Sequence, residues 1–139
     1  MLSKPEHGWS EFSLGESCYS ISYLTNVPLD WLDRAIFGLE TLLPFEVDGY
    51  CEPGRMVCTV DFSESHIFFE NGERDKQNSF CEVIPINMLD FCEQLHKDIT
   101  DNIDDWQKWN SSYSLTKEEL QFRLDRLKKL IYVKANCFN

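Results

Sequence analysis

The sequence is poor in basic residues. Only 13 Lys and Arg stand against 24 Asp and Glu in 139 residues, which gives a formal net charge of −11. A surface of this sign repels phosphates and anionic headgroups, so the deficit argues against direct binding to nucleic acid or to an anionic membrane. Aromatic residues make up 14% of the chain, which argues against intrinsic disorder. The length predicts a single domain, 1–139, that can bury a core without metals or disulfides.

Long apolar runs are also missing. Residues Met1 to His7 contain no apolar segment of the signal-peptide type, and no stretch is long enough to span a bilayer. We therefore expect a cytoplasmic protein with no membrane partner, in which thiols stay reduced. No two cysteines form a CxxC pair, which argues against a structural zinc site and favours buried thiols that pack as small hydrophobes. The six cysteines are Cys18, Cys51, Cys58, Cys81, Cys92 and Cys137.

Short catalytic motifs are absent as well. The chain has no glycine-rich phosphate loop and no HExxH, GxSxG or EF-hand pattern. Its three histidines, His7, His66 and His96, have no spacing that links them to a nucleophile or to metal ligands. We expect no enzyme activity, no metal and no cofactor. One alternative stays open: Asp61 and Glu64 lie near His66 across a predicted hairpin, where they could form the polar site of a small enzyme or ligand-binding domain.

The hydrophobic periodicity predicts an α+β domain, with an antiparallel sheet of four to six strands and three helices. The expected order is ββαβββαα. A period of two predicts strands at 9–14, 18–24, 55–62, 65–70 and 80–86. Three-and-four spacing predicts helices at 28–43, 89–109 and 117–131. Residues 45–54 are expected to form a connection, and 71–78 a polar loop.

Helix-boundary signals support these assignments. Pro28 suits a first helical turn and Pro44 ends the helix, while Thr116 and Glu119 form a capping box. His96 lies on the apolar stripe of the long helix, where we expect it to be packed rather than catalytic. The first helix is expected to bury a stripe made of Leu29, Leu32, Ile36, Leu39 and Leu43.

Charge is unevenly distributed along the chain. Residues 1–110 hold 21 acids and 7 bases, whereas residues 111–139 hold 3 acids and 6 bases. Acidic side chains recur on one side of the predicted long helix and around Tyr50 in the predicted connection. This pattern predicts either a solubilising surface or an acidic face for a basic partner. The basic last helix could also pair with its acidic neighbour and use part of that face internally.

Aromatic residues beside the acids are candidate anchors for a partner, because tryptophan and tyrosine dominate interface hot spots. Trp106, Trp109 and Tyr113 follow the acidic helix, and we expect at least one of the two tryptophans to lie in the core instead. The residues expected to bind a partner are Glu46, Asp48, Tyr50, Glu52, Asp98, Asp101, Asp105 and Trp109.

In its overall character the chain resembles bacterial immunity proteins of contact-dependent growth-inhibition and other polymorphic toxin systems. The features behind the resemblance are the acidic helix 90–105, the acidic loop 46–52 and the aromatics Tyr50, Trp106 and Trp109. The resemblance implies a monomer or weak homodimer that binds a cognate toxin domain, often a basic nuclease, and blocks its active site or substrate surface. A structural homodimer formed through exposed aromatics is the remaining alternative.

Overall fold

The computed structural model describes residues 1–70, 80–110 and 115–137. Within these residues the chain has an α+β fold with antiparallel sheets, as the sequence predicts. Two predictions, the polar loop at 71–78 and the anchor Tyr113, lie outside the described residues. The strands divide between a two-stranded and a four-stranded sheet, where a single sheet is expected from the sequence.

The two-stranded sheet is an N-terminal hairpin. Its strands are β1 (Trp9–Leu14) and β2 (Ser17–Ser22). Alternation along β1 buries Phe12 and leaves Glu11 and Ser13 at the surface, and Ile21 of β2 is also completely buried. Ile21 packs so closely on the larger sheet that a Cβ added at Gly49 would lie 2.6 Å from its Cγ2.

The four-stranded sheet is a meander in the order β3-β4-β5-β6. Its strands are β3 (Phe45–Tyr50), β4 (Arg55–Val60), β5 (Ser65–Glu70) and β6 (Phe80–Ile84). The prediction of a connection over 45–54 is wrong, because its first six residues form β3. Phe45 and Val47 are buried while Glu46 is exposed, so β3 follows the period-two pattern of a half-buried strand.

The helices of the described residues also differ from the expected set. They are α1 (Val27–Thr41), α2 (Met88–Asp101), α3 (Ile103–Gln107) and α4 (Lys117–Lys134), and a 3₁₀ turn, Ala135–Cys137, follows α4. The predicted helix at 89–109 is interrupted at Asn102, whose φ of −129° departs from helical geometry. The order is therefore ββαββββααα rather than ββαβββαα.

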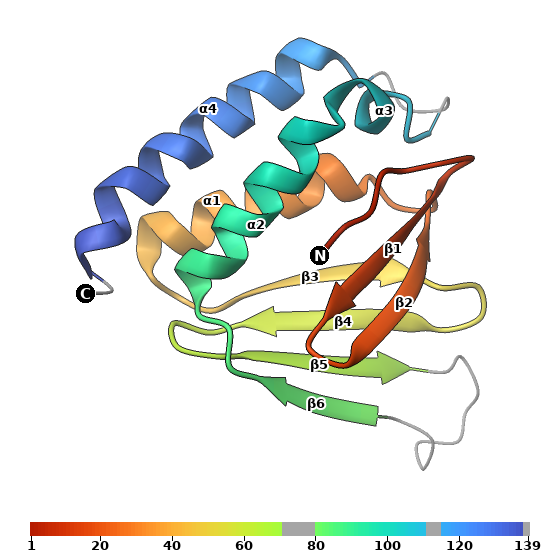
Figure 1. The fold of residues 1–139 in the computed structure, drawn as a ribbon, viewed down its shortest axis with the longest axis horizontal. Helices are drawn as coiled ribbons and strands as arrows, with labels where there is room; N and C mark the ends of the chain where they lie inside the picture. The colour runs from red at the N-terminus through yellow and green to blue at the C-terminus, as the bar shows by residue number, and fades with distance from the viewer. Residues whose placement is uncertain (71–79, 111–114, 138–139) are drawn as a thin grey trace.

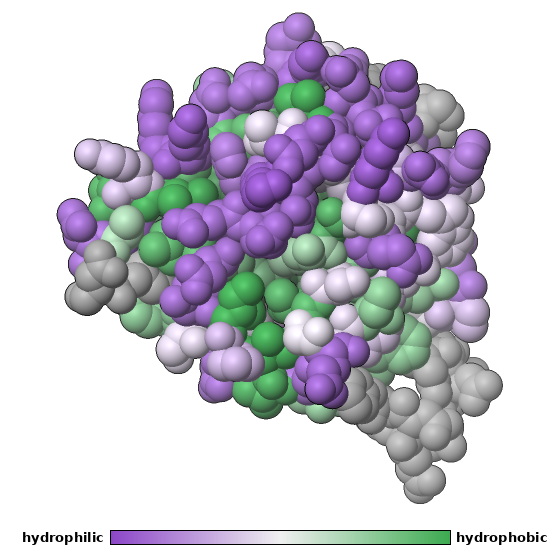
Figure 2. All heavy atoms as spheres, viewed as in Figure 1, coloured by the Kyte–Doolittle hydropathy of each residue, from purple (hydrophilic) through white to green (hydrophobic). Residues whose placement is uncertain are grey.

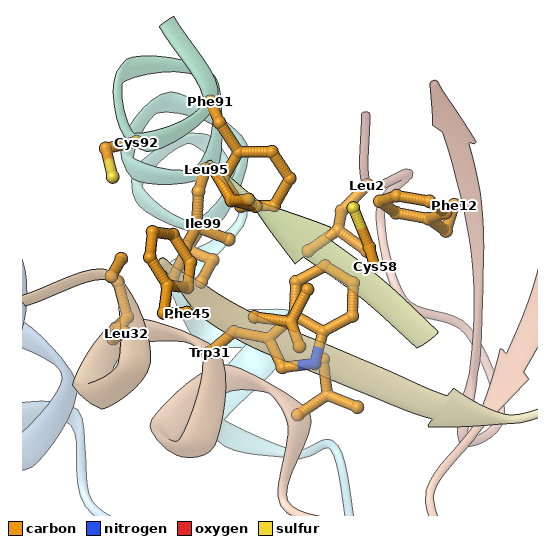
Figure 3. Packing of buried hydrophobic residues seen from close by; sticks show 14 of the residues in the cluster. Leu2, Phe12, Trp31, Leu32, Phe45, Cys58, Phe91, Cys92, Leu95 and Ile99 are labelled. Atoms are coloured by element: carbon orange, nitrogen blue, oxygen red, sulfur yellow. The ribbon is translucent and has the colours of Figure 1, made fainter. Parts of the chain in front are cut away.

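The elements form layers on one face of the four-stranded sheet. Figure 1 shows the hairpin crossing in front of the sheet, α2 beside it, and α4 as the outermost helix. Helix α4 packs on both α1 and α2. Side chains from these elements meet in one hydrophobic cluster, in which Phe91 of α2, Trp31 of α1, Phe45 of β3 and Phe12 of β1 lie close together (Figure 3).

The buried side of α1 is wider than the predicted stripe. Leu32 and Leu39 are fully buried as expected and Trp31 is buried with them, whereas Leu43 lies beyond the end of the helix and is 54% exposed. The Trp31 indole reaches β3, where Nε1 donates a hydrogen bond of 2.9 Å to the carbonyl oxygen of Asp48. This contact orients α1 and fastens it to the edge strand of the sheet.

Candidate partner-binding site

The predicted acidic loop is a strand, and this places three of its site residues on one side. Glu46, Asp48 and Tyr50 alternate with the buried side chains of β3, so they point to the face of the sheet away from the helices. Glu52 follows in the turn between β3 and β4, with a φ of 45°. The structure thus brings these four predicted residues together at one edge of the sheet.

Two carboxylates of α1 join this edge. Asp30 and Asp33 line a hollow of about 320 Å³ together with Glu46, Asp48 and two arginines. Burial, and then the charges of Asp33 and Asp48, raise the pKa of Asp30 above its usual value. We call these four residues the acidic edge: Asp30, Asp33, Glu46 and Asp48.

Nearby arginines neutralise part of the acidic edge. Arg55 Nη2 lies 2.8 Å from Asp48 Oδ2, and Arg123 Nε of α4 lies 2.8 Å from Asp33 Oδ1. Glu46 and Asp30 have no ion pair of this kind among the contacts of the described residues. Arg34 also lines the hollow, and its charge opposes the rise in the pKa of Asp30. The four carboxylates therefore stand against three guanidinium groups, which leaves a small excess of negative charge.

The sequence did not reveal the part played by Asp30 and Asp33. Both were interpretable only as acids in the first turns of a helix, where they interact favourably with the helix dipole. Their approach to Glu46 depends on β3 lying beside α1. A hidden signal was present in the alternation of Phe45, Glu46 and Val47, which is typical of a strand.

The predicted acids of the long helix form a separate group on the helical side of the molecule. Figure 2 shows a band of hydrophilic residues along α2. Asp98 is used internally, because its Oδ2 accepts a hydrogen bond of 2.9 Å from the backbone N–H of Leu2 and lies 3.4 Å from the Met1 amino group. Asp101 pairs with Lys97 at 2.6 Å. Asp105 lines a different hollow, of about 340 Å³, at the N-terminal segment.

Trp109 is not an exposed anchor, so that prediction is wrong. Its side chain is only 2% exposed, and its Nε1 donates a hydrogen bond of 2.8 Å to the carbonyl oxygen of Thr25. Trp106 is fully buried against it, with ring centroids 5.1 Å apart. Both tryptophans therefore lie in the core, where the sequence predicts at least one of them.

The polar cluster predicted on the β4–β5 hairpin does come together. His66 Nε2 lies 3.3 Å from Asp61 Oδ2 and 3.6 Å from Glu64 Oε1. All three side chains are at least 36% exposed, so they form a surface cluster at the turn rather than an enclosed site. Across residues 1–70, 80–110 and 115–137, no group of three His, Cys, Asp or Glu side chains is arranged to hold a metal ion.

The outer face of the four-stranded sheet is a surface that the sequence analysis missed. Cross-strand pairing puts Asp48, Val57, Phe68 and Cys81 in one row across the sheet. A second row contains Glu46, Thr59, His66 and Val83, and a third contains Tyr50, Arg55 and Glu70. We call these side chains the outer face; each is partly or largely exposed.

The six cysteines are all free thiols. Only Cys58 and Cys92 are fully buried as expected, while Cys18, Cys81 and Cys137 are exposed. The exposed thiols lie on the solvent side of strands or at the end of α4. The expectation of small buried hydrophobes is therefore right for two cysteines and wrong for these three.

In the described parts of the chain, no helix combines the length and apolar character that a bilayer crossing requires. Comparisons with protein-family models, with curated proteins and with solved structures find no match for this chain.

Proposed function

We propose that this protein is an immunity-type inhibitor that binds a basic toxin domain and blocks it stoichiometrically. It acts as a binder rather than as an enzyme, and the complex forms in the cytoplasm, where the free thiols stay reduced. The observation that carries the proposal is the acidic edge, in which carboxylates from α1 and β3 converge on one hollow.

The electrostatics of this edge favour a cationic partner. The pKa of Asp30 is raised because burial and two like charges disfavour its ionised form. A lysine or arginine entering the hollow would relieve that crowding and leave the carboxylates charged. Opposite charges across an interface also steer the encounter and raise the association rate. An inhibitor that must intercept a toxin quickly benefits from such steering.

The acids of α2 and α3 are weaker candidates for this role. Asp98 is occupied by the N-terminal backbone and Asp101 by Lys97. Groups that already have partners gain less from a new cation, because the old contact must be given up. The proposal therefore assigns partner recognition to Glu46 and Asp30, with Tyr50 beside them, ahead of Asp98 and Asp101.

The test uses candidate basic toxin domains from the native host, beginning with the product of the neighbouring reading frame. Stopped-flow association is measured for the parent protein and for the double variant Asp30→Asn, Glu46→Gln. We expect association to slow by about tenfold at low salt and to become less dependent on salt. Survival of cells that express the toxin reports whether the binding neutralises it.

A charge-matched control separates the two acidic groups. The double variant Asp101→Asn, Asp105→Asn removes the same charge from the helical side and should leave the association rate nearly unchanged. Slowing by this control alone would move the contact to the helices and refute the role of the acidic edge. Failure of every neighbour-encoded basic toxin domain to bind at micromolar concentration would refute the proposed function itself.

A further inference from the structure

We infer that the outer face of the four-stranded sheet is the docking surface for a cationic protein segment that presents apolar side chains between lysines or arginines. This inference rests on the proposed function, because it names the surface and the chemistry by which the same partner would be held. It goes beyond the acidic edge, which only supplies charge.

The first argument is the apolar centre of this face. Val57 lies directly opposite Phe68, and Val83 lies opposite His66, the residue two positions from Phe68 on the same strand. The three apolar side chains therefore adjoin one another across β4, β5 and β6. Phe68 is 37% exposed and Val83 55% exposed, although the opposite face of the same strands is buried. An apolar group of this kind on an open sheet is typical of an interaction site.

The second argument is the charged rim. Glu46, Asp48 and Glu70 stand on the outer face against one guanidinium, that of Arg55. The turn beyond β4 adds Asp61 and Glu64 beside His66. An apolar centre inside a polar rim is the usual anatomy of a protein interface, and a rim of carboxylates selects a partner with basic residues.

The same rim argues against a second copy of this chain as the occupant. Face-to-face pairing of two copies would bring carboxylates of both rims together, and like charges in contact oppose association. A basic foreign protein meets no such repulsion.

The size of the face suits the centre of an interface. Four strands at about 4.8 Å spacing and six residues at about 3.3 Å give a surface of roughly 15 by 20 Å. A standard interface covers about 800 Å² per partner, so the outer face supplies its middle. The acidic edge and the exposed Tyr50 extend it on the β3 side.

The experiment follows the methyl groups of the six valines by NMR while a heptapeptide of alternating lysine and leucine is added. Val57 and Val83 lie on the outer face, Val47 and Val60 are buried beneath the sheet, and Val133 lies on the exposed side of α4. We expect the Val57 and Val83 signals to shift most. A peptide of alternating lysine and serine should shift them less, since it lacks the apolar contacts.

Two pairs of variants sharpen the result. Phe68→Ser and Val83→Lys change the outer face, while Phe122→Ser and Val133→Lys make the same changes on α4, at side chains that are 72% and 62% exposed. The outer-face variants should weaken peptide binding by about fivefold or more, and the α4 variants should not. Thermal melting checks that each variant is folded. If Phe68→Ser does not fold, Val83→Lys, which lies on an edge strand, carries the test.

Three outcomes would overturn the inference. The largest shifts could fall on Val133, the two peptides could bind equally well, or sedimentation could show a dimer that Phe68→Ser dissolves, which would make a second copy the occupant. The two proposals fail separately. If a toxin binds the Phe68→Ser and Val83→Lys variants as tightly as the parent, the outer face is not the docking surface, but the proposed function stands. If the peptide docks on the outer face and no toxin binds, the proposed function fails, but the docking surface stands.

Discussion

At the residue scale, burial divides the cysteines into two chemical classes. Burial raises the pKa of the Cys58 thiol to about 12, and it raises the pKa of Cys92 as well, with a smaller contribution from the charge of Glu93. A thiol attacks electrophiles as the thiolate, so both groups are inert in the folded protein. Cys18 and Cys81 are exposed on strands and meet solvent directly.

This difference predicts the course of alkylation. Maleimide at neutral pH should modify Cys18, Cys81 and Cys137 within minutes, the half-buried Cys51 more slowly, and the two buried thiols only after urea is added. Peptide mass spectrometry at successive times identifies each modified site. Equal rates for Cys58 and Cys18 in the folded protein would contradict the burial of β4.

His96 links α2 to α4 and makes the fold sensitive to acid. Its ring donates a hydrogen bond to the Leu124 carbonyl oxygen, and burial, together with the charge of Lys128, lowers its pKa below the ordinary 6.5; the hydrogen bond and Asp125 oppose the shift. The folded protein therefore holds the neutral ring at pH values where the unfolded chain takes up a proton. Stability from this site is present above pH 6.5 and is lost as the pH falls below it.

The His96→Gln variant should remove this part of the pH dependence. Between about pH 7 and pH 5.5, the melting temperature of the parent protein should fall more steeply than that of the variant. His7→Gln is the matched control, because His7 is exposed in the N-terminal segment. Parallel curves for the parent and His96→Gln would show that His96 does not carry the effect.

At the element scale, the packing of α1 on β3 depends on a glycine. A Cβ added at Gly38 would lie 2.2 Å from Cδ1 of the Phe45 ring, which is buried and cannot retreat into solvent. In an exposed helix, replacing glycine by alanine gains about 1 kcal/mol. Here overpacking costs about 1–3 kcal/mol and outweighs that gain.

The Gly38→Ala variant should therefore unfold at a lower urea concentration than the parent. Arg34→Ala, on the exposed side of the same helix, serves as the control and should change the free energy of unfolding by less than about 0.5 kcal/mol. A variant as stable as the parent would mean that Phe45 can move and that the α1–β3 contact is looser than described.

The elements that the sequence predicted well are those whose side chains repeat cleanly. The hairpin, the strands of β4 and β5, and the capping box of α4 follow patterns with a single interpretation; Thr116 accepts from the Glu119 N–H at 3.1 Å as expected. Strand β3 was not predicted, because Asp48, Gly49 and the Pro53-Gly54 pair that follows have the composition of a loop. Only its pairing with β4 overrides that local preference.

The candidate site was harder to predict because it depends on tertiary contacts. The sequence groups acids by their order along a helix, yet Asp98 accepts a hydrogen bond from the backbone N–H of Leu2, 96 residues away. Likewise, Trp109 donates a hydrogen bond to the carbonyl oxygen of Thr25, 84 residues away. Tyr50 and Glu46 were placed correctly together, since they are neighbours in the chain. The outer face could not be found, because it joins residues of four strands whose register the sequence does not specify.

At the scale of the whole molecule, charge is organised by pairing between layers. The basic α4 meets α1 through Arg123 with Asp33 and through Arg126 with Glu40, and Lys117 meets Asp104 of α3. The last helix thus pairs with acidic neighbours, as the sequence suggested, although chiefly with α1 rather than α2.

This distribution predicts pH-dependent self-association. As the pH approaches the isoelectric point of about 4.6, the net charge of the protein falls toward zero and the electrostatic repulsion between copies fades. Light scattering should show growing assemblies between about pH 5.5 and 4.6 that dissolve on return to pH 7. Phe68→Ser should shift their onset to lower pH, and Phe122→Ser should not. If assembly of the two variants begins at the same pH, the surface that mediates self-association is not the outer face.

The meander of the four-stranded sheet has a kinetic consequence. Each strand pairs with its neighbour in the chain, so the loops that pairing must close are short. The contact of α4 with α1, by contrast, joins residues 90 positions apart at Arg123 and Asp33. Since loop-closure entropy grows with separation, we expect the hairpins to assemble early and α4 to dock last. The helix that completes the core is thus also the one whose release would open it first.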